Sequence, residues 1–346
     1  MVRSVVYDGK DLCIICAADG ARKGVITFGP WLQNPLGTRS CVTAKGFGDG
    51  AFIKRGIDEF HVVPRRNHWY HSPEMAEVEK LARSFAATRK VITYGSSMGG
   101  YGAAVMSARL GVPAVALAPQ FTLDADIAPW ETRWREEAQA IGAFDNGATS
   151  RDGAASGYLF YDPFTSLDAG QASLFRARSN FTFVPCPFSG HATSAMVNRT
   201  YSLRRVVSDV LDGTFSTAEF LAARRAYDRG SDDMYVAMFY VRASARKKAA
   251  AADWAADRLL QLDSRLGAKS LRTLFTFEMR RGRKDLAKSW AKAASQLEPA
   301  TPGDCFIAAR LATHAELRDE ARQILRHGLA ISPANVALKR ELEALG

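Results

Sequence analysis

The chain has 346 residues, which is enough for one large domain and a smaller one. Its hydrophobic content of 47% and charged content of 24% are those of a globular protein, and no apolar run reaches the roughly 18 residues that a membrane span needs. These values argue against a disordered, fibrous or membrane-spanning chain. The apolar patch in the first residues is too short for a signal peptide and lacks a small-residue cleavage site, so we expect a cytoplasmic protein.

The net charge of +10 is unevenly distributed. Residues 215–346 hold 23 Lys and Arg against 16 Asp and Glu, an excess of 7, which leaves +3 for the rest of the chain. A basic segment can bind nucleic acid. Here the basic residues are interspersed with acidic ones on expected helices and are not interleaved with aromatic residues. Mixed charge of this kind usually faces solvent, so we expect no nucleic-acid partner.

The five cysteines are scattered along the chain. Cys13 and Cys16 fall in an apolar run that is typical of a strand, where residues three apart face opposite sides. No second pair has the spacing of a zinc site. We therefore expect five reduced thiols and no metal.

Short apolar segments alternate with helical ones over the first 214 residues. The pattern predicts strands at 3–7, 11–17, 24–28, 59–63, 91–94, 113–117, 157–161 and 180–184. It predicts helices at about 47–55, 74–87, 98–110, 169–178 and 192–211. This alternation indicates a doubly wound α/β domain over 1–214 with a mostly parallel sheet, which binds ligands beyond the carboxyl ends of its strands. Residues 119–156 interrupt the pattern, either as a cap over the site or as a surface excursion.

The segment that organises this domain runs from the strand at 91–94 into Gly95-Ser-Ser97-Met-Gly99 and then a helical pattern. Gly-x-Ser-x-Gly between a strand and a helix holds its central serine in a strained turn, with the hydroxyl projecting from the strand end. The alternative is a Gly-rich phosphate loop, but no Gly-Lys-Ser/Thr follows. We predict that Ser97 is a nucleophile and that the Met98 N–H stabilises an oxyanion.

A serine nucleophile needs a base, and the base needs an orienting acid. The expected order along this kind of chain is Ser, Asp, His. His191 follows the last predicted strand and is the only histidine between Ser97 and the C-terminal helices. Asp162 directly follows the preceding strand, so we favour it as the acid. Asp168 is the alternative acid, and Asp124 is a weaker one.

A second oxyanion donor usually comes from the loop after the third strand. That loop contains Gly29, Pro30 and Trp31, and proline has no N–H. We therefore assign the second donor to Trp31.

Residues after the fourth and sixth strands are candidates for substrate contact. Arg65, Arg66, Trp69 and Tyr70 follow the fourth strand, and Gln120 follows the sixth. Their basic, aromatic and amide side chains suit a polar or anionic acyl acceptor. We assign Trp69, Tyr70 and Gln120 to substrate binding.

These motifs resemble the α/β-hydrolase superfamily over about residues 3–212. The resemblance rests on Tyr94-Gly-Ser-Ser97-Met-Gly-Gly-Tyr, Tyr161-Asp162-Pro and Ser-Gly190-His191. The phrase Gly-Ser-Ser-Met-Gly-Gly-Tyr is especially similar to bacterial members associated with surface polysaccharides and with acyl or acetyl transfer on glycans. The resemblance implies serine acyl-transfer chemistry without a metal or cofactor.

Residues 215–346 are rich in Ala, Leu and Arg and have helical periodicity. Lys284-Asp-Leu-Ala287 aligns with Arg318-Asp-Glu-Ala321, and the period of 34 residues resembles tetratricopeptide repeats. A weaker copy covers about 233–267. Such an all-α region of helical hairpins serves either as a buttress or as a docking surface for a protein partner or a second copy of the chain.

Together these features predict a serine esterase or acyltransferase that forms an acyl-Ser97 intermediate on a small-molecule or glycan ester. The alternatives are a catalytically idle adaptor that binds a partner through its C-terminal helices, and a thioesterase or peptidase on the same scaffold.

Overall fold

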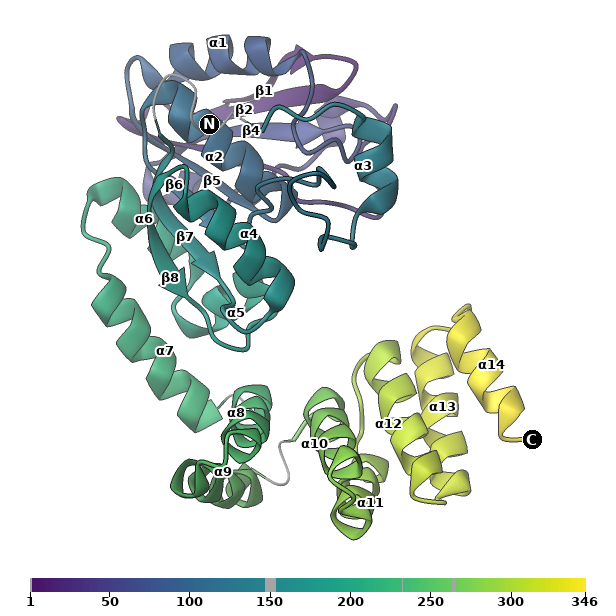
Figure 1. Ribbon diagram of the computed structural model, residues 1–346. Helices are drawn as coiled ribbons and strands as arrows, with labels where there is room; N and C mark the ends of the chain where they lie inside the picture. Colours follow the sequence, from purple (N-terminus) through teal and green to yellow (C-terminus); the bar gives the residue numbers. More distant parts are fainter. Residues whose placement is uncertain (1, 147–153, 232, 263–265) are drawn as a thin grey trace. The chain divides into compact units, whose positions relative to one another are not determined.

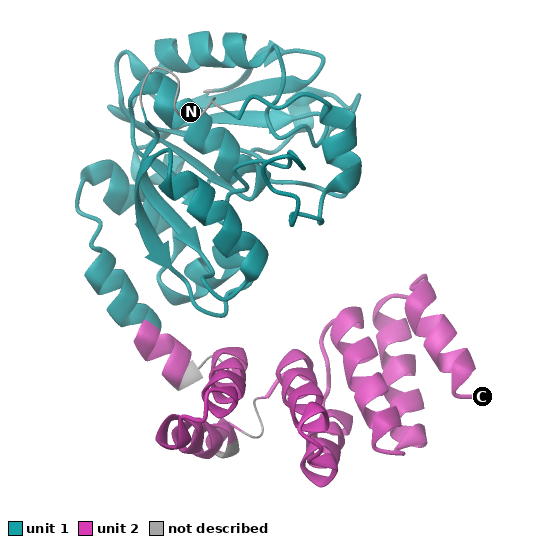
Figure 2. Cartoon of the chain, viewed as in Figure 1, with its two compact units in different colours: residues 1–224 teal, residues 225–346 magenta. Residues whose placement is uncertain are grey.

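The computed structural model describes residues 2–146, 154–231, 233–262 and 266–346. It divides into two compact units, residues 1–224 and 225–346, which are coloured separately in Figure 2. Within the part of the chain that is described, no helix has the length and apolar character that a membrane span requires. Each unit is described here by itself.

An eight-stranded sheet forms the centre of the first unit (Figure 1). Its strands are β1 Val2–Asp8, β2 Leu12–Ala18, β3 Lys23–Phe28, β4 Asp58–Pro64, β5 Lys90–Ser96, β6 Ala114–Leu117, β7 Ser156–Tyr161 and β8 Asn180–Pro185. The spatial order is β1-β2-β4-β3-β5-β6-β7-β8. β2 is antiparallel to both of its neighbours, and all strands from β4 to β8 are parallel. The predicted strands and the mostly parallel sheet are confirmed.

Helices cover both faces of this sheet. They are α1 Met75–Ala86, α2 Met98–Leu110, α3 Arg135–Ile141, α4 Ser166–Arg176, α5 Thr193–Thr200 and α6 Leu203–Asp212. The next helix, α7 Thr217–Ser231, begins in the first unit and ends in the second. Successive residues of β3 divide between two cores: Ile26 packs with α1, α2 and α4, whereas Val25 packs with α5 and α6. On β2, Cys13 and Cys16 likewise belong to different cores, and none of the five cysteines forms a disulfide. The fold is the predicted doubly wound α/β-hydrolase-like one.

Two predicted helices differ from the structure. Only η2, a 3₁₀ turn at Ile53–Arg55, forms within 47–55, because the Glu59 carboxylate accepts the N–H groups of Gly50, Phe52 and Ile53 and holds that backbone in a turn. A second 3₁₀ turn, η1, covers Cys41–Thr43. The helix predicted over 192–211 is divided into α5 and α6 at Ser202, whose φ of 71° no right-handed helix accommodates.

The second unit is helical throughout its described residues. Its helices are α8 Asp233–Ala245, α9 Ala249–Leu262, α10 Ala268–Arg280, α11 Lys284–Ser295, α12 Pro302–His314, α13 Arg318–Ile331 and α14 Val336–Ala344. α11 and α13 begin 34 residues apart, and the matched Ala287 and Ala321 are both fully buried. The weaker repeat copy predicted over 233–267 includes 263–265, which lie outside the described residues. The helical region is confirmed, and its likeness to tetratricopeptide repeats stays a prediction.

Candidate active site

Ser97 lies in the turn between β5 and α2. Its φ of 56° and ψ of −123° are those of a strained backbone, and the turn is closed by the Ser97 N–H, which donates to the Leu117 carbonyl at 2.8 Å. A Cβ at Gly95 would lie 2.0 Å from the Gly99 carbonyl oxygen, and one at Gly99 would lie 2.2 Å from the Phe28 carbonyl oxygen. Both glycines are therefore required by packing, and they place Ser97 at the carboxyl end of the sheet.

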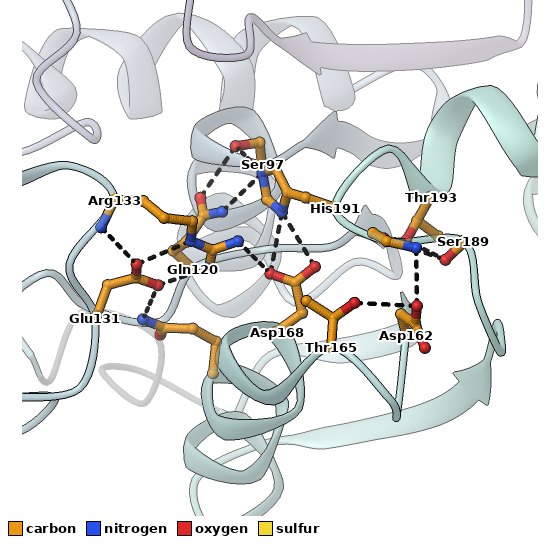
Figure 3. Close-up of polar contacts among 12 residues, drawn as sticks. Ser97, Gln120, Glu131, Arg133, Asp162, Thr165, Asp168, Ser189, His191 and Thr193 are labelled. Atoms are coloured by element: carbon orange, nitrogen blue, oxygen red, sulfur yellow. Dashed lines mark hydrogen bonds and ion pairs between the residues drawn. The ribbon is translucent and has the colours of Figure 1, made fainter. Parts of the chain in front are cut away.

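His191 meets Ser97 from the loop between β8 and α5. Its Nε2 lies 2.9 Å from Ser97 Oγ, and its Nδ1 lies 3.1 and 3.2 Å from the two carboxylate oxygens of Asp168 (Figure 3). With Asp168 ionised, Nδ1 must carry a proton, and Nε2 is then free to accept the Ser97 hydroxyl proton. A hydroxyl, an imidazole and a carboxylate thus form one hydrogen-bonded chain.

The other histidines of the first unit have different surroundings. His61 is hydrogen-bonded to the buried Glu59 at 3.1 Å. His68 accepts the Tyr70 N–H through Nδ1 at 2.9 Å, and burial lowers its pKa. Burial also lowers the pKa of His71 to about 4. Among the described histidines, only His191 is within hydrogen-bond reach of Ser97.

The acid favoured from the sequence, Asp162, occupies a different place. Its carboxylate accepts backbone N–H groups of Phe188 at 3.1 Å and of Gly190 at 2.8 Å, together with donors in its own turn. It makes no hydrogen bond with His191. The alternative, Asp168, contacts the imidazole, while Asp162 binds the backbone of the loop that carries it; which of the two serves as the acid stays a prediction.

Asp168 is ionised in this site. It lies in the first turn of α4, is 3% exposed, and receives the Arg133 guanidinium at 2.6 Å. Burial raises the pKa of Asp168, but the hydrogen bond and electrostatic attraction from His191 and from the Arg133 guanidinium outweigh it, so the pKa lies below its ordinary value of 3.8. The amino end of α4 favours the same negative charge.

Gln120 contacts both Ser97 and His191. It follows β6 and is fully buried; its Oε1 accepts from Ser97 Oγ at 3.1 Å, and its Nε2 lies 3.1 Å from His191 Nε2. A neutral imidazole has one acceptor lone pair on Nε2, so the Gln120 amide competes with the Ser97 hydroxyl for it. The side chain predicted to bind substrate is thus part of the resting hydrogen-bond network.

The loop after β3 keeps one candidate for the second oxyanion donor. The Gly29 N–H donates to the Val62 carbonyl at 3.2 Å, and the Leu32 N–H donates to Asn67 Oδ1 at 3.1 Å. Pro30 has no N–H. Among the described residues 29–32, the Trp31 backbone N–H has no intramolecular acceptor, and its role as the second donor stays a prediction. The Met98 N–H opens α2, where helix N–H groups have no intrahelical partner.

An aromatic cluster borders His191. The ring of Trp134 lies 6.2 Å from that of His191, 5.2 Å from Trp31 and 5.5 Å from Trp69, measured between ring centroids. Trp69 is only 1% exposed, so it supports Trp134 rather than presenting its own surface. The Trp31 indole N–H donates to Glu137, which ties the loop after β3 to α3.

The remaining predicted substrate contacts have structural partners. The Tyr70 hydroxyl is buried and donates to the Gly29 carbonyl at 2.8 Å. The Arg65 guanidinium donates to the carbonyls of Gly9 and Gly37 at 2.8 and 2.6 Å, and Arg66 pairs with Asp11 at 2.9 Å. Both arginines hold loops together, and neither is hydrogen-bonded to the described side chains of Ser97, His191 or Asp168.

The insertion after β6 contributes residues that no sequence motif marks. Of the predicted range 119–156, residues 147–153 lie outside the described residues. Arg133 contacts Asp168, and Trp134 contacts His191. Beside Trp134 is a cavity of about 340 Å³, lined by Leu123, Ala125, Pro129, Glu131, Trp134, Arg135, Ala138 and Gln139.

No family model and no curated protein matches the chain. Solved structures with a similar fold include acetyl xylan esterase 1 from Thermoanaerobacterium sp. JW/SL YS485, with 11% identity over 59% of this chain and 80% of that one and a TM-score of 0.40. The α/β-hydrolase MGS-MChE2 from a sediment metagenome has 14% identity, covers 61% and 98%, and has a TM-score of 0.37. A truncated carbohydrate esterase from gut microbiota has 12% identity, covers 62% and 90%, and has a TM-score of 0.36. Such distant similarities say nothing about the substrate of this chain.

Proposed function

We propose that the chain is a serine hydrolase that cleaves carboxylic esters through an acyl-enzyme on Ser97. The observation that carries this proposal is the continuous contact from Ser97 Oγ to His191 Nε2 at 2.9 Å and from His191 Nδ1 to the buried Asp168 carboxylate at 3.1 Å. An alcohol becomes nucleophilic at neutral pH only with a base in reach, and an oriented base is what this contact supplies.

Each residue then has one role in the first half-reaction. Ser97 Oγ attacks the ester carbonyl carbon while His191 Nε2 takes the hydroxyl proton, and Asp168 stabilises the resulting imidazolium. The carbonyl oxygen becomes an oxyanion that accepts the N–H groups of Met98 and Trp31. As the C–O bond breaks, His191 gives its proton to the leaving alkoxide.

In the second half-reaction an acceptor hydroxyl attacks the acyl-Ser97 carbonyl carbon, and His191 Nε2 removes its proton. The bond between the acyl carbon and Ser97 Oγ then breaks, and His191 returns the proton to Ser97 Oγ. Water gives hydrolysis, and a sugar hydroxyl gives acyl transfer. Gln120 must release His191 Nε2 for both steps, since its amide and the acceptor proton use the same lone pair. We infer that substrate binding draws the Gln120 amide away, which makes it a substrate-binding residue.

We assign the substrate to the small-molecule and glycan acyl esters. The cavity next to Trp134 combines apolar walls from Leu123 and Pro129 with the polar side chains of Glu131 and Arg135. A mixed lining of this kind suits an acylated sugar, whose ring and acyl group are partly apolar and whose hydroxyls are polar. Thioester and peptide substrates share the same acyl-enzyme and differ only in this pocket.

The direct experiment is labelling with a fluorophosphonate probe, combined with turnover of p-nitrophenyl acetate, for the wild type and Ser97→Ala. We expect labelling at Ser97 and a loss of turnover by several orders of magnitude in the variant. An idle adaptor predicts no labelling. A panel of p-nitrophenyl esters, acyl-CoAs and acetylated sugars then separates esterase from thioesterase activity.

A further inference from the structure

We propose that Arg133 is a positioning residue that holds Asp168 toward His191, with Glu131 as its counter-ion. The insertion after β6 would then supply a residue that orients the acid of the catalytic site, as well as lying next to that site. This inference rests on the proposed serine hydrolase function, because it assigns Arg133 a role that acts through the triad.

The first support is the set of partners around Asp168. Its carboxylate accepts from His191 Nδ1 at 3.1 Å and from Arg133 Nη1 at 2.6 Å, both at the same oxygen, Oδ1. Within the described residues it accepts no backbone N–H, whereas the nearby Asp162 accepts N–H groups from its own turn and from the His191 loop. The orientation of Asp168 therefore depends on a side chain from another segment.

The second support is that Arg133 is itself held in place. Glu131 Oε1 accepts from Arg133 Nε at 2.9 Å, and Glu131 Oε2 accepts from Arg133 Nη2 at 2.6 Å, which is a two-pronged pair (Figure 3). The side chain of Glu131 is 1% exposed and that of Arg133 is 20% exposed. A guanidinium fixed between two buried carboxylates presents the third donor, Nη1, to Asp168 in one geometry.

The third support links this pair back to the helix of Asp168. Gln171, three residues further along α4, donates to Glu131 Oε2 at 3.2 Å. Its amide also donates to the Thr122 carbonyl at 2.8 Å and accepts the Thr122 N–H at 3.2 Å. Gln171 of α4 therefore binds the insertion at Thr122 and at Glu131, next to the contact between Asp168 and Arg133. These hydrogen bonds hold the Asp168 carboxylate in its orientation toward His191.

The charges around His191 predict how Arg133 affects the base. Asp168 favours protonated His191, and Arg133 opposes it by repulsion and by sharing the Asp168 charge. Glu131 offsets part of the Arg133 charge, and Asp162 faces the same loop but is bonded to the Gly190 N–H. Removing the guanidinium should therefore make His191 easier to protonate and move the acidic limb of the kcat/KM profile to higher pH.

The experiment compares Arg133→Gln, Arg133→Lys and Arg176→Gln on a p-nitrophenyl ester. Arg176 lies at the far end of α4, stacks on Phe183 and gives the same change in net charge. For Arg133→Gln we expect kcat to fall about 10- to 100-fold through misplacement of the acid. We also expect the acidic limb of the kcat/KM profile to move to higher pH, with KM little changed.

The other variants separate position from charge. Arg133→Lys should keep the acidic limb of the kcat/KM profile at the wild-type pH, but its kcat should lie between those of Arg133→Gln and the wild type. Guanidinium chloride at low millimolar concentration should partly restore the kcat of Arg133→Gln. Arg176→Gln should match the wild type. If Arg133→Gln keeps the wild-type limb, or if it behaves like Arg176→Gln, the inference is wrong.

Ser97→Ala keeps this result distinct from a failure of the proposed function. If Ser97→Ala keeps full turnover, the proposed serine mechanism is wrong. If Ser97→Ala loses turnover while Arg133→Gln behaves like the wild type, only the role of Arg133 is wrong. Should Arg133→Gln fail to fold, Arg133→Lys with its pH profile still decides the question.

Discussion

Replacing the two aspartates of the α4 region one at a time gives the sharpest test of the site. Asp168→Asn removes the negative charge that faces His191 Nδ1 at 3.1 and 3.2 Å, while leaving the side chain nearly the same size. Two unit charges about 4 Å apart interact by about 4 kcal/mol at an effective dielectric constant near 20. Because about 1.4 kcal/mol corresponds to a factor of ten in rate, kcat should fall roughly a thousandfold.

Asp162→Asn is the matched comparison, since it makes the same chemical change six residues away. Asp162 Oδ1 accepts the N–H groups of Phe164 and Phe188, and Oδ2 accepts the Thr165 hydroxyl and the Gly190 N–H, so the amide nitrogen of Asn deprives one of these two pairs of its acceptor. Each poorly satisfied buried donor costs about 1–3 kcal/mol of stability. We therefore expect a clearly lower Tm with a loss of kcat of no more than about tenfold, which reflects a looser His191 loop.

The assay is steady-state hydrolysis of p-nitrophenyl acetate at several pH values, with Tm measured on the same samples. Activities should be compared at a temperature where all variants are folded. A severe loss of kcat in Asp162→Asn, combined with near wild-type kcat in Asp168→Asn, would refute the assignment of Asp168 and restore the acid that the strand order favoured.

Two further predictions concern Gln120 and Asp168. Gln120→Glu places a carboxylate near His191 Nε2, where the amide nitrogen now lies at 3.1 Å. Fluorophosphonate labelling of Ser97 should therefore drop at pH 7 and recover toward pH 9. Equal labelling at the two pH values would contradict this prediction. Because the pKa of Asp168 is lowered below 3.8 in the fold, its ionised form stabilises the protein above that value and the stabilisation is lost as pH falls through the lower folded-state pKa. The Tm of the wild type should accordingly decline below pH 4 more steeply than that of Asp168→Asn, and parallel declines would show that Asp168 is not the group involved.

The features that the sequence predicted well are local or ordered along the chain. The strands carry β-branched and aromatic runs, and the Gly-x-Ser-x-Gly turn links one of them directly to a helix. Ser97 and His191 were selected by that turn and by the order of residues, and the structure places them 2.9 Å apart. Both requirements can be read from short segments because they are set by backbone geometry.

The acid could not be selected in the same way. Asp162 and Asp168 both lie after β7 and before His191, so residue order does not separate them. What separates them is tertiary: the Asp162 carboxylate is occupied by backbone N–H groups of two loops, and the first turn of α4 aims Asp168 at the imidazole. The contact from Arg133 joins segments 35 residues apart without any fixed spacing, so no motif could reveal it.

The tryptophan cluster makes the site observable without any substrate. Trp31, Trp69 and Trp134 are in ring contact, and Trp134 also borders the imidazole of His191. A protonated imidazole quenches indole fluorescence, whereas a neutral one does so much less. The intrinsic emission of the protein therefore provides a signal from the surroundings of His191 that is independent of turnover.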